Sequence, residues 1–393
     1  QELFINVGNH SKKILLIENG KLIEKYEEED GKERMEDNIY LGIVENVLPG
    51  MQAAFVDIGK EKNTFIHIRD IIPKASNETG NKNEIFGKYD IKDYLKPGMP
   101  IMVQVKKDST NKKGARISSH ISISGRFCVL MPQENFITIS QKIDDEQERE
   151  RLLTILKEVV PEGYGAIVRT SAVSKTKEEI EYDVKKLVNR YEGIQKKFQK
   201  AKRVKKPVLL YQSESVIQKT LVDLMDQDLY RIVTNDKATY KEIESFLKQE
   251  NVEIQLEMRE NLLEFYDLEK QLEEMNNRKI WLKCGGFITI DKTEALTAID
   301  VNSGKYTGKK DLEETIFTVN KEATIEIAKQ LRLRDIGGII IIDYIDMQSK
   351  ENEEKIIELL REQLRRDRSK TQIVGFSKLN LLEMTRKHMC SND

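Results

Sequence analysis

Hydrophobic and polar positions alternate most regularly in the last third of the chain. Short apolar runs there are separated by segments in which apolar residues recur every three to four positions, the spacing of an amphipathic helix. Strands are expected at 279–283, 286–290, 295–301, 339–343 and 371–376, with helices at 311–336 and 351–368. This alternation predicts a sheet with parallel strands, and functional groups are expected at their carboxyl ends. The four isoleucines at 339–342 predict a fully buried strand.

The rest of the chain divides by pattern into four stretches. Residues 1–35 show two β-like runs followed by acidic residues, which indicates a hairpin and a solvated linker. Residues 38–124 contain several short strands punctuated by glycine and proline, a pattern typical of a small β-barrel of the OB type. Residues 126–212 alternate strands with a Lys-rich helical segment, whereas residues 213–278 are expected to be largely helical.

Composition narrows the class of protein. With 393 residues the chain has room for two to three domains of roughly 150 residues each. Its 65 basic and 67 acidic side chains give a net charge of −2, so nucleic-acid binding would rest on local basic patches. The run QKKFQKAKRVKKP at 195–207 is either such a patch or a solvated helix face.

Targeting signals and cysteines add two further expectations. No apolar run is long enough to cross a membrane and no signal peptide opens the chain, so a cytoplasmic protein is expected. The cysteines Cys128, Cys284 and Cys390 are far apart. They fit neither a disulfide framework nor a C-x-x-C metal pair, and we interpret them as reduced packing thiols.

Two aspartates interrupt the apolar strands expected near the end of the chain. Asp300 follows Ile299, and Asp343 ends the run of isoleucines. Burying such a carboxylate is costly unless it is paired, protonated or bound to a cation. With Asn302 on the same strand face as Asp300, a shared cation is favoured over two separate helix caps, and hard oxygen ligands favour Mg²⁺ or Mn²⁺. Asp346 would either support this site or cap the next helix.

Several motifs together resemble one family. They are TAIDVNSG at 297–304, LRLRDIGG at 331–338, IDYIDM at 342–347, LLEMTRK at 381–387, NIY at 38–40, QAAFVDIG at 52–59 and VRT at 168–170. These segments closely resemble the ribonuclease E/G family. The resemblance extends over nearly the whole chain, and the motifs are long and in the same order, which makes a chance match an unlikely explanation.

The resemblance implies a multidomain α/β protein with four parts. An RNase H-like structural domain would comprise residues 1–37 and 213–278, and an OB-type RNA-binding barrel would be inserted at 38–125. A 5′-end sensor would follow at 126–212. A DNase I-like α/β catalytic domain would occupy 279–393.

The same resemblance implies a reaction and its residues. Asp300 and Asp343 would bind Mg²⁺, and Asn302 would orient the scissile phosphate or the attacking water. The reaction would be endonucleolytic hydrolysis of single-stranded RNA in rRNA and mRNA processing and decay, with a 5′-phosphate left on the downstream product. It would be stimulated by a 5′-monophosphate on the substrate.

Two further groups of residues carry over from the family. The pocket that reads the 5′-monophosphate would contain Arg169, Thr170, Gly125 and Val129, and a guanidinium suits bidentate phosphate contacts. The RNA-binding residues of the barrel would be Phe55, Phe65 and Lys113. Ordinary barrel core remains the alternative for the two phenylalanines, and a solvated loop lysine is the alternative for Lys113.

Two rival functions stay open, and the chain departs from the family pattern at three places. A non-catalytic RNA-binding protein would not need the acidic residues, and a nuclease for DNA would not need the barrel and sensor matches. The chain has LGI at 41–43 where relatives often have Lys-Gly-Lys, and Lys370 where some have arginine. Relatives also place a Cys-x-x-Cys zinc link after the catalytic domain, but here only Cys390 lies near that position, so zinc is not supported. Whether the chain forms a homo-oligomer stays open.

Overall fold

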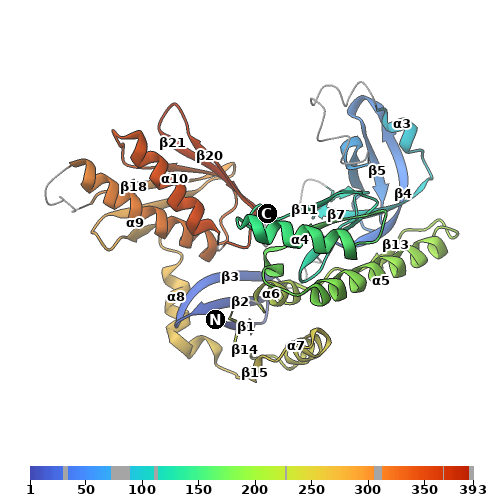
Figure 1. Cartoon of the computed structure of the whole chain (residues 1–393), viewed down its shortest axis with the longest axis horizontal. Coiled ribbons are helices and arrows are strands. Elements are labelled where there is room, and N and C mark those ends of the chain that lie inside the picture. Colours follow the sequence, from blue (N-terminus) through green and yellow to red (C-terminus); the bar gives the residue numbers. More distant parts are fainter. Residues whose placement is uncertain are drawn as a thin grey trace. The chain divides into compact units, whose positions relative to one another are not determined.

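The computed structural model of the chain describes residues 1–29, 34–71, 89–109, 114–225, 228–304, 312–365 and 367–388. It divides into two compact units, one formed by Gln1–Lys32 with Leu224–Asn392 and the other by Glu33–Asp223. Each unit is built around two β-sheets (Figure 1). The four domain boundaries expected from the sequence stay a prediction.

The first sheet of the first unit joins strands from distant parts of the chain. Its order is β15-β14-β1-β2-β3, with β1 antiparallel to β2 and parallel to β14. The bounds are β1 Glu2–Val7, β2 Ser11–Glu18, β3 Lys21–Glu29, β14 Arg231–Thr234 and β15 Gln255–Met258. The expectation that 213–278 is largely helical was therefore wrong for β14 and β15, because four-residue strands leave almost no periodic signal. The helical elements of this stretch are α6 Val216–Leu224, α7 Lys237–Glu250, η4 Leu262–Asp267 and α8 Leu268–Glu274.

The second sheet of this unit has six strands in the order β16-β17-β18-β19-β21-β20. Their bounds are β16 Lys279–Trp281, β17 Phe287–Lys292, β18 Leu296–Asn302, β19 Gly338–Asp343, β20 Thr371–Phe376 and β21 Leu381–Arg386. Only the neighbours β18 and β19 are parallel, because β21 inserts between β19 and β20 and is antiparallel to both. The predicted parallel sheet is thus correct for one neighbouring pair.

Two helices, α9 Leu312–Leu333 and α10 Lys350–Leu364, pack together against one face of this sheet (Figure 1). Ile340 and Ile342 point into the core beneath the helices and are fully buried. Ile339 lies on the opposite face and is 51% exposed. The prediction of a fully buried strand was wrong, because alternate residues of a strand face opposite sides and helices cover only one side here.

The second unit contains a closed barrel of five strands. β4 pairs with β5 on one side and β7 on the other, and β6 and β8 complete the circle. The bounds are β4 Ile39–Leu48, η1 Pro49–Met51, β5 Ala53–Asp57, β6 Thr64–His67, η2 Ile68–Asp70, α3 Ile91–Tyr94, β7 Pro100–Lys107 and β8 Arg116–Ser118. Gly42 is needed where β4 crosses β5, because a Cβ atom there would lie 2.5 Å from Val56 Cγ1. The architecture agrees with the expected OB-like barrel.

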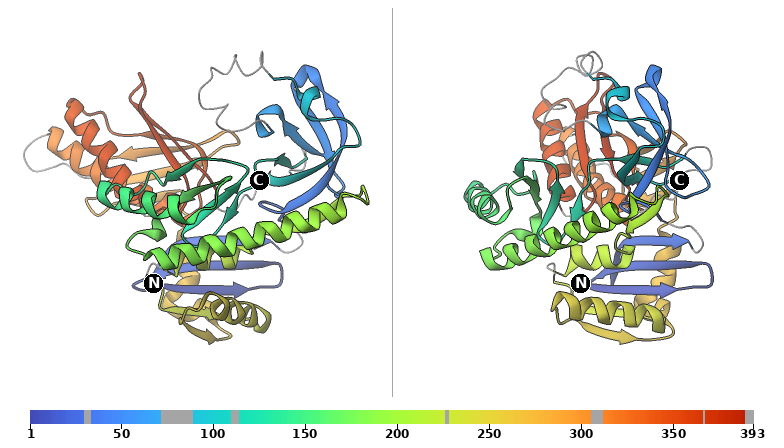
Figure 2. Two further views of the ribbon diagram at one scale, coloured as in Figure 1. Left: turned by 45° about the vertical axis from the view of Figure 1, so that its right-hand side comes forward. Right: turned by 90° about the vertical axis from the view of Figure 1, so that its right-hand side faces the viewer.

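A four-stranded sheet, β11-β12-β10-β9, forms the rest of this unit. The bounds are β9 Ile123–Ser124, β10 Cys128–Pro132, β11 Ile137–Ile139, α4 Glu146–Val159, β12 Tyr164–Val168, η3 Thr170–Ala172, α5 Lys177–Ala201 and β13 Val208–Tyr211. Helices α4 and α5 pack against the sheet (Figure 2), and β13 returns to pair with β4 of the barrel. Thr176 and Glu179 form a capping box that starts α5, which satisfies two otherwise unpaired backbone N–H groups.

Candidate functional site

Asp300 and Asp343 face each other across the parallel pair β18 and β19. The register pairs the two residues directly, so their backbones are one strand spacing apart, about 4.8 Å. On β18, Thr297, Ile299 and Val301 fill the core, and the alternation turns Asp300 to the face that the helices leave open. The structure therefore brings the two predicted aspartates together at the carboxyl ends of their strands.

Asn302 completes this group. It follows Asp300 by two positions on β18, and its Nδ2 donates a hydrogen bond of 2.6 Å to Asp300 Oδ2. Partial burial at the strand end raises the pKa of Asp343, and the negative charges of Asp300 and Asp346 raise it further. No ion pair among the described residues includes Asp300 or Asp343. In the part of the chain that the structure describes, the two like charges therefore lie side by side without an ion-pair partner.

Asp346 does not cap the following helix. Its carboxylate accepts a 3.4 Å hydrogen bond from Asn380 Nδ2, and the side chain is exposed. The backbone N–H groups of Gln348 and Ser349 at the start of α10 instead donate to Glu313 of α9, at 3.1 and 3.2 Å. The capping alternative is wrong, and the charge of Asp346 acts on Asp343.

A buried amide that sequence reasoning missed holds the loop after Asp343. Asn320 of α9 is fully buried, donates to the Ile345 carbonyl at 2.8 Å and accepts from the Ile345 N–H at 3.2 Å. The hydroxyls of Thr324 and Tyr344 lie 2.9 Å apart beside it. The available signal was a pair of polar residues, Asn320 and Thr324, on the apolar stripe of the helix.

The donor set suits a small hard cation. Carboxylate and amide oxygens are the ligands preferred by Mg²⁺ and Mn²⁺, and Mg²⁺ is commonly held by one or two carboxylates with water and phosphate oxygens. Within the described residues, no group of three or more His, Cys, Asp or Glu side chains is arranged to hold a metal. The two carboxylates and the neighbouring amide of Asn302 are oxygen donors of the kind that a hard divalent cation takes, and the metal itself belongs to the proposal below.

The second unit brings Arg169 and Gly125 together. Arg169 Nη1 donates to the Gly125 carbonyl at 2.8 Å, and Nη2 forms an ion pair with Asp223. Val129 lies half-buried on β10, and Thr170 begins η3 with its side chain exposed. The four residues expected at the phosphate pocket thus lie around one end of the β10–β12 pair, with a carboxylate already on the arginine.

The backbone turn at Gly125 is held from α5. The carboxylate of Asp183, which is 6% exposed, accepts backbone hydrogen bonds from Phe127 at 2.9 Å and from Arg126 and Cys128 at 3.2 Å. A Cβ atom at Gly125 would lie 2.6 Å from Asp183 Oδ2. The sequence match did not reveal Asp183, whose only signal is an acidic residue on the buried stripe of α5.

The barrel presents Phe55 and Phe65 as a neighbouring pair. They are directly opposite on β5 and β6, with ring centroids 6.2 Å apart and planes at 67°. Phe55 is 36% exposed, and the residues on either side of it, Ala54 and Val56, are fully buried. The alternative that both rings form ordinary barrel core is wrong for Phe55, which is exposed. Phe65 is half-buried, so only part of its ring belongs to the core. Lys113 lies outside the described residues.

Comparison with known proteins identifies the family. The sequence model of the ribonuclease E/G family matches residues 122–389. Ribonuclease G of Salmonella typhimurium (strain SL1344) is 38% identical over 391 residues, which cover 98% of this chain and 79% of that protein. This chain belongs to the ribonuclease E/G family. Ribonuclease E of Nostoc sp. (strain PCC 7120) is 37% identical over 364 residues, covering 90% of this chain and 51% of its own length.

Two other features of this family member bear on earlier expectations. No helix in the described ranges is long and apolar enough to cross a membrane. Cys128 and Cys284 are free cysteines, and Cys390 falls outside the described residues.

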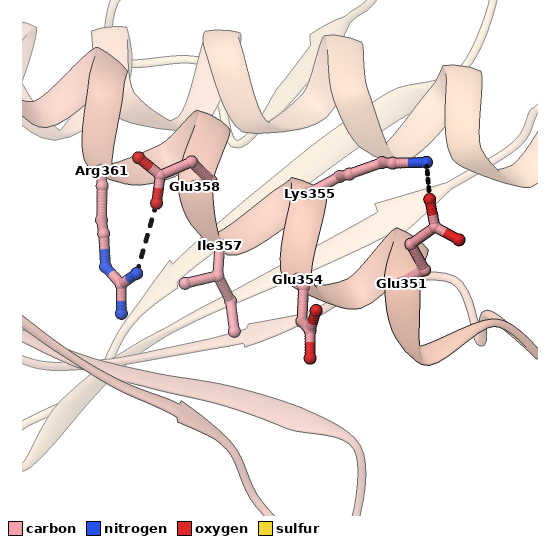
Figure 3. A pocket seen from close by; sticks show the side chains of 6 residues that line it. All are labelled: Glu351, Glu354, Lys355, Ile357, Glu358 and Arg361. Atoms are coloured by element: carbon pink, nitrogen blue, oxygen red, sulfur yellow. Dashed lines mark hydrogen bonds and ion pairs between the residues drawn. The ribbon is translucent and has the colours of Figure 1, made fainter.

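An open depression on α10 is separate from the acidic group. It is lined by Glu351, Glu354, Lys355, Ile357, Glu358 and Arg361, all on one helix (Figure 3). Glu351 pairs with Lys355 at 2.7 Å, and Glu358 pairs with Arg361 at 3.3 Å. These are ordinary ion pairs of neighbouring helix turns, so the depression adds no chemistry to the site.

Proposed function

We propose that this endoribonuclease of the ribonuclease E/G family hydrolyses single-stranded RNA at a magnesium site formed by Asp300 and Asp343. The observation that carries the proposal is the direct pairing of the two carboxylates on the open sheet face, without an ion pair to any described residue. Their mutual repulsion favours a bound cation. Mn²⁺ would satisfy the same oxygen ligands.

Each residue of the site has a different role in this proposal. When bound, the metal supplies charge stabilisation for the phosphate and activates water for attack. Asp300 and Asp343 would hold it, and the hydrogen bond from Asn302 Nδ2 fixes the orientation of the Asp300 carboxylate. The Asn302 side chain would also orient the scissile phosphate or the attacking water. The downstream product would carry a 5′-phosphate.

Stimulation by a 5′-monophosphate is the second element of the proposal. Arg169 would bind the phosphate, with Thr170, Gly125 and Val129 shaping the pocket. A guanidinium has five N–H donors, and the Gly125 carbonyl and Asp223 engage Nη1 and Nη2. The phosphate would therefore compete with the Asp223 carboxylate while Gly125 keeps the arginine in place.

The barrel would hold the RNA through its bases. Phe55 and Phe65 offer ring surface on the outside of β5 and β6, and stacking of a base on such a ring is worth about 1–3 kcal/mol. Arg116, which is in register with Phe65 on β8, lies beside them and forms an ion pair with Asp70 at 3.0 Å. Lys113 is proposed as a further RNA contact from the sequence match.

The domain assignments are part of the same proposal. The strand order β3-β2-β1-β14-β15 supports an RNase H-like domain, and the helix-covered sheet of 279–388 supports a DNase I-like catalytic domain. The sheet at 123–168 with α4 and α5 would be the 5′-end sensor. We place the activity in rRNA and mRNA processing and decay in the cytoplasm, and a homo-oligomer is compatible with it.

A cleavage assay tests the proposal. The full chain is incubated with a 5′-monophosphorylated single-stranded RNA, its 5′-hydroxyl form and a DNA oligomer of the same sequence, while Mg²⁺ is titrated against a chelator. We expect saturable Mg²⁺-dependent cleavage of RNA, faster with the 5′-monophosphate. Equal cleavage of DNA would indicate a DNA nuclease, and RNA binding without cleavage at any Mg²⁺ or Mn²⁺ concentration would overturn the catalytic proposal.

A further inference from the structure

An aromatic pair lies on the open sheet face beside the acidic group. Trp281 on β16 pairs in register with Phe287 on β17, and Phe287 pairs with Asn302 on β18. Residues in register across neighbouring strands project to the same face. The backbone of Trp281 therefore lies two strand spacings, about 10 Å, from that of Asn302, and its side chain projects to the face that carries Asp300 and Asp343.

The exposure of Trp281 differs from that of a core aromatic side chain. Trp281 is 59% exposed, although tryptophan is among the side chains with most to gain from burial. Its ring centroid lies 5.3 Å from that of Phe287, with the planes at 63°. The half-buried Phe287 thus supports the indole from one side, and the indole remains open to a ligand.

A lysine adds positive charge to the same place. Lys279 Nζ lies 4.2 Å from the centroid of the Trp281 ring and 3.6 Å from that of Phe287. Lys279 makes no ion pair with any described residue. It is in register with Thr289, which is in register with Asp300. A cation on an aromatic surface, in the same cross-strand row as the acidic group, suits a ligand that has both flat rings and negative charge.

We propose that Trp281, supported by Phe287 and Lys279, stacks a base of the single-stranded RNA close to the scissile phosphate. This platform rests on the proposed function, since it positions the substrate of the same site. Lys279 would contact a phosphate next to the stacked base. The platform is continuous with the acidic group through Asn302, which favours a nucleotide over a separate protein partner.

The chain offers a direct probe of this platform, because Trp281 is its only tryptophan. The full chain is titrated with a 5′-monophosphorylated single-stranded RNA in EDTA, which prevents cleavage, and tryptophan fluorescence is recorded. We expect saturable quenching as a base stacks on the indole. A series of RNAs with one abasic nucleotide, moved along the strand, should lose the quenching only when the gap lies near the cleavage position.

Variants connect the platform to catalysis. Trp281→Ala should raise KM for RNA roughly tenfold while kcat changes little, and Trp281→Phe should restore most of the loss, since base stacking is sequence-tolerant but needs a ring. Lys279→Gln should lower the salt dependence of KM by about 0.7 in the log–log slope, the value for one lost phosphate contact. Ile325→Ala, an exposed position on the outer side of α9, is the matched control and should change neither quantity.

The outcomes separate this proposal from the catalytic one. If RNA is cleaved, but quenching is absent and Trp281→Ala leaves KM unchanged, the platform is wrong and the catalytic site stands. If quenching and its abasic profile are present while no variant of the acidic group affects cleavage, the platform stands and the metal assignment fails. Fluorescence that changes with protein concentration alone, without RNA, would show a contact between copies and would overturn the base-stacking role.

Discussion

The acidic group, which consists of Asp300, Asp343 and the adjoining Asn302, differs from the arginine pocket around Arg169 in how its charges are balanced. Asp300 and Asp343 face each other at the ends of β18 and β19 without an ion pair to a described residue, and the pKa of Asp343 is raised in part by that neighbour. Arg169, in contrast, is bound by the Gly125 carbonyl and by the carboxylate of Asp223. Among the described residues the carboxylate pair has no cationic partner, whereas the arginine is already paired with a carboxylate of the same unit.

This difference has a functional consequence. A repulsive carboxylate pair gains most from a divalent ion, so the proposed metal would contribute directly to the order of the site. If Arg169 binds the 5′-phosphate as proposed, it exchanges one anionic partner for another, so the two kinds of 5′ end would be distinguished by a modest net free energy. We therefore expect loss of either aspartate to abolish cleavage. Changes at Arg169 should alter the cleavage rate only in part.

The largest effect is expected when either Asp300 or Asp343 is neutralised. Asp300→Asn and Asp343→Asn should each lower the cleavage rate by at least about a hundredfold, because the stabilisation supplied by a bound ion is worth several kcal/mol. The fold should remain intact or gain stability, since the change removes like-charge repulsion. Cleavage assays at saturating Mg²⁺ with urea unfolding of each variant check this.

Asp291→Asn is the matched control for these variants. Asp291 lies on the neighbouring strand β17 and pairs with Arg278, so its neutralisation should leave cleavage unchanged. A near wild-type rate in Asp300→Asn or Asp343→Asn would disprove the metal assignment.

Replacing Arg169 tests the proposed 5′-phosphate pocket. Arg169→Ala should abolish the preference for 5′-monophosphorylated over 5′-hydroxyl RNA, a loss of roughly tenfold for a charge-assisted contact, and leave the 5′-hydroxyl rate unchanged. Arg169→Lys should recover only part of the preference, because an ammonium lacks the bidentate fork. Parallel kinetics on the two substrates measure this, and an equal loss on both would indicate a structural arginine.

Asp223→Asn sharpens the contrast between the two sites. Neutralising the carboxylate that pairs with the half-buried Arg169 should lower KM for 5′-monophosphorylated RNA by up to about fivefold, which corresponds to about 1 kcal/mol, the upper end for ion pairs that solvent still reaches. The 5′-hydroxyl substrate should not respond, which makes it the internal control. A raised KM on the phosphorylated substrate would instead show that Asp223 is needed to hold the arginine in position.

The smallest effect is expected at Asp346. Its negative charge raises the pKa of Asp343, so Asp346→Asn should lower that pKa. If the proposed metal binds Asp343, protons compete with it for the carboxylate. Cleavage should then fall as the pH drops through this pKa, and the variant should shift that acid limb to lower pH. Above the pKa, where Asp343 is ionised, the variant should also unfold at slightly higher urea concentration.

The pH profiles of cleavage for wild type and Asp346→Asn test this directly. Asp291→Asn again serves as the control and should keep the wild-type profile. An acid limb that does not move would show that Asp343 does not titrate in the functional range.

Local pattern was enough to predict most elements and the residues of the acidic group. Helical spacing predicted α9 and α10, and apolar runs ending in an acid predicted β18 and β19 with Asp300 and Asp343 at their ends. These predictions succeed because periodicity and strand ends are properties of a few consecutive residues. The family resemblance was confirmed by the comparisons.

Long-range pairing decided the rest. The insertion of β21 between β19 and β20, and the addition of β14 and β15 to β1, depend on contacts between residues far apart in sequence. The same holds for the hydrogen bond between Asn320 and Ile345 and for the ion pair between Asp223 and Arg169. It also holds for the row in which β17 connects Trp281 of β16 with Asn302 of β18. The sequence by itself determined which side chains stand at strand ends. Only tertiary structure decided their partners, because the free energy of pairing two strands or side chains depends on residues that are distant in sequence and adjacent in the fold.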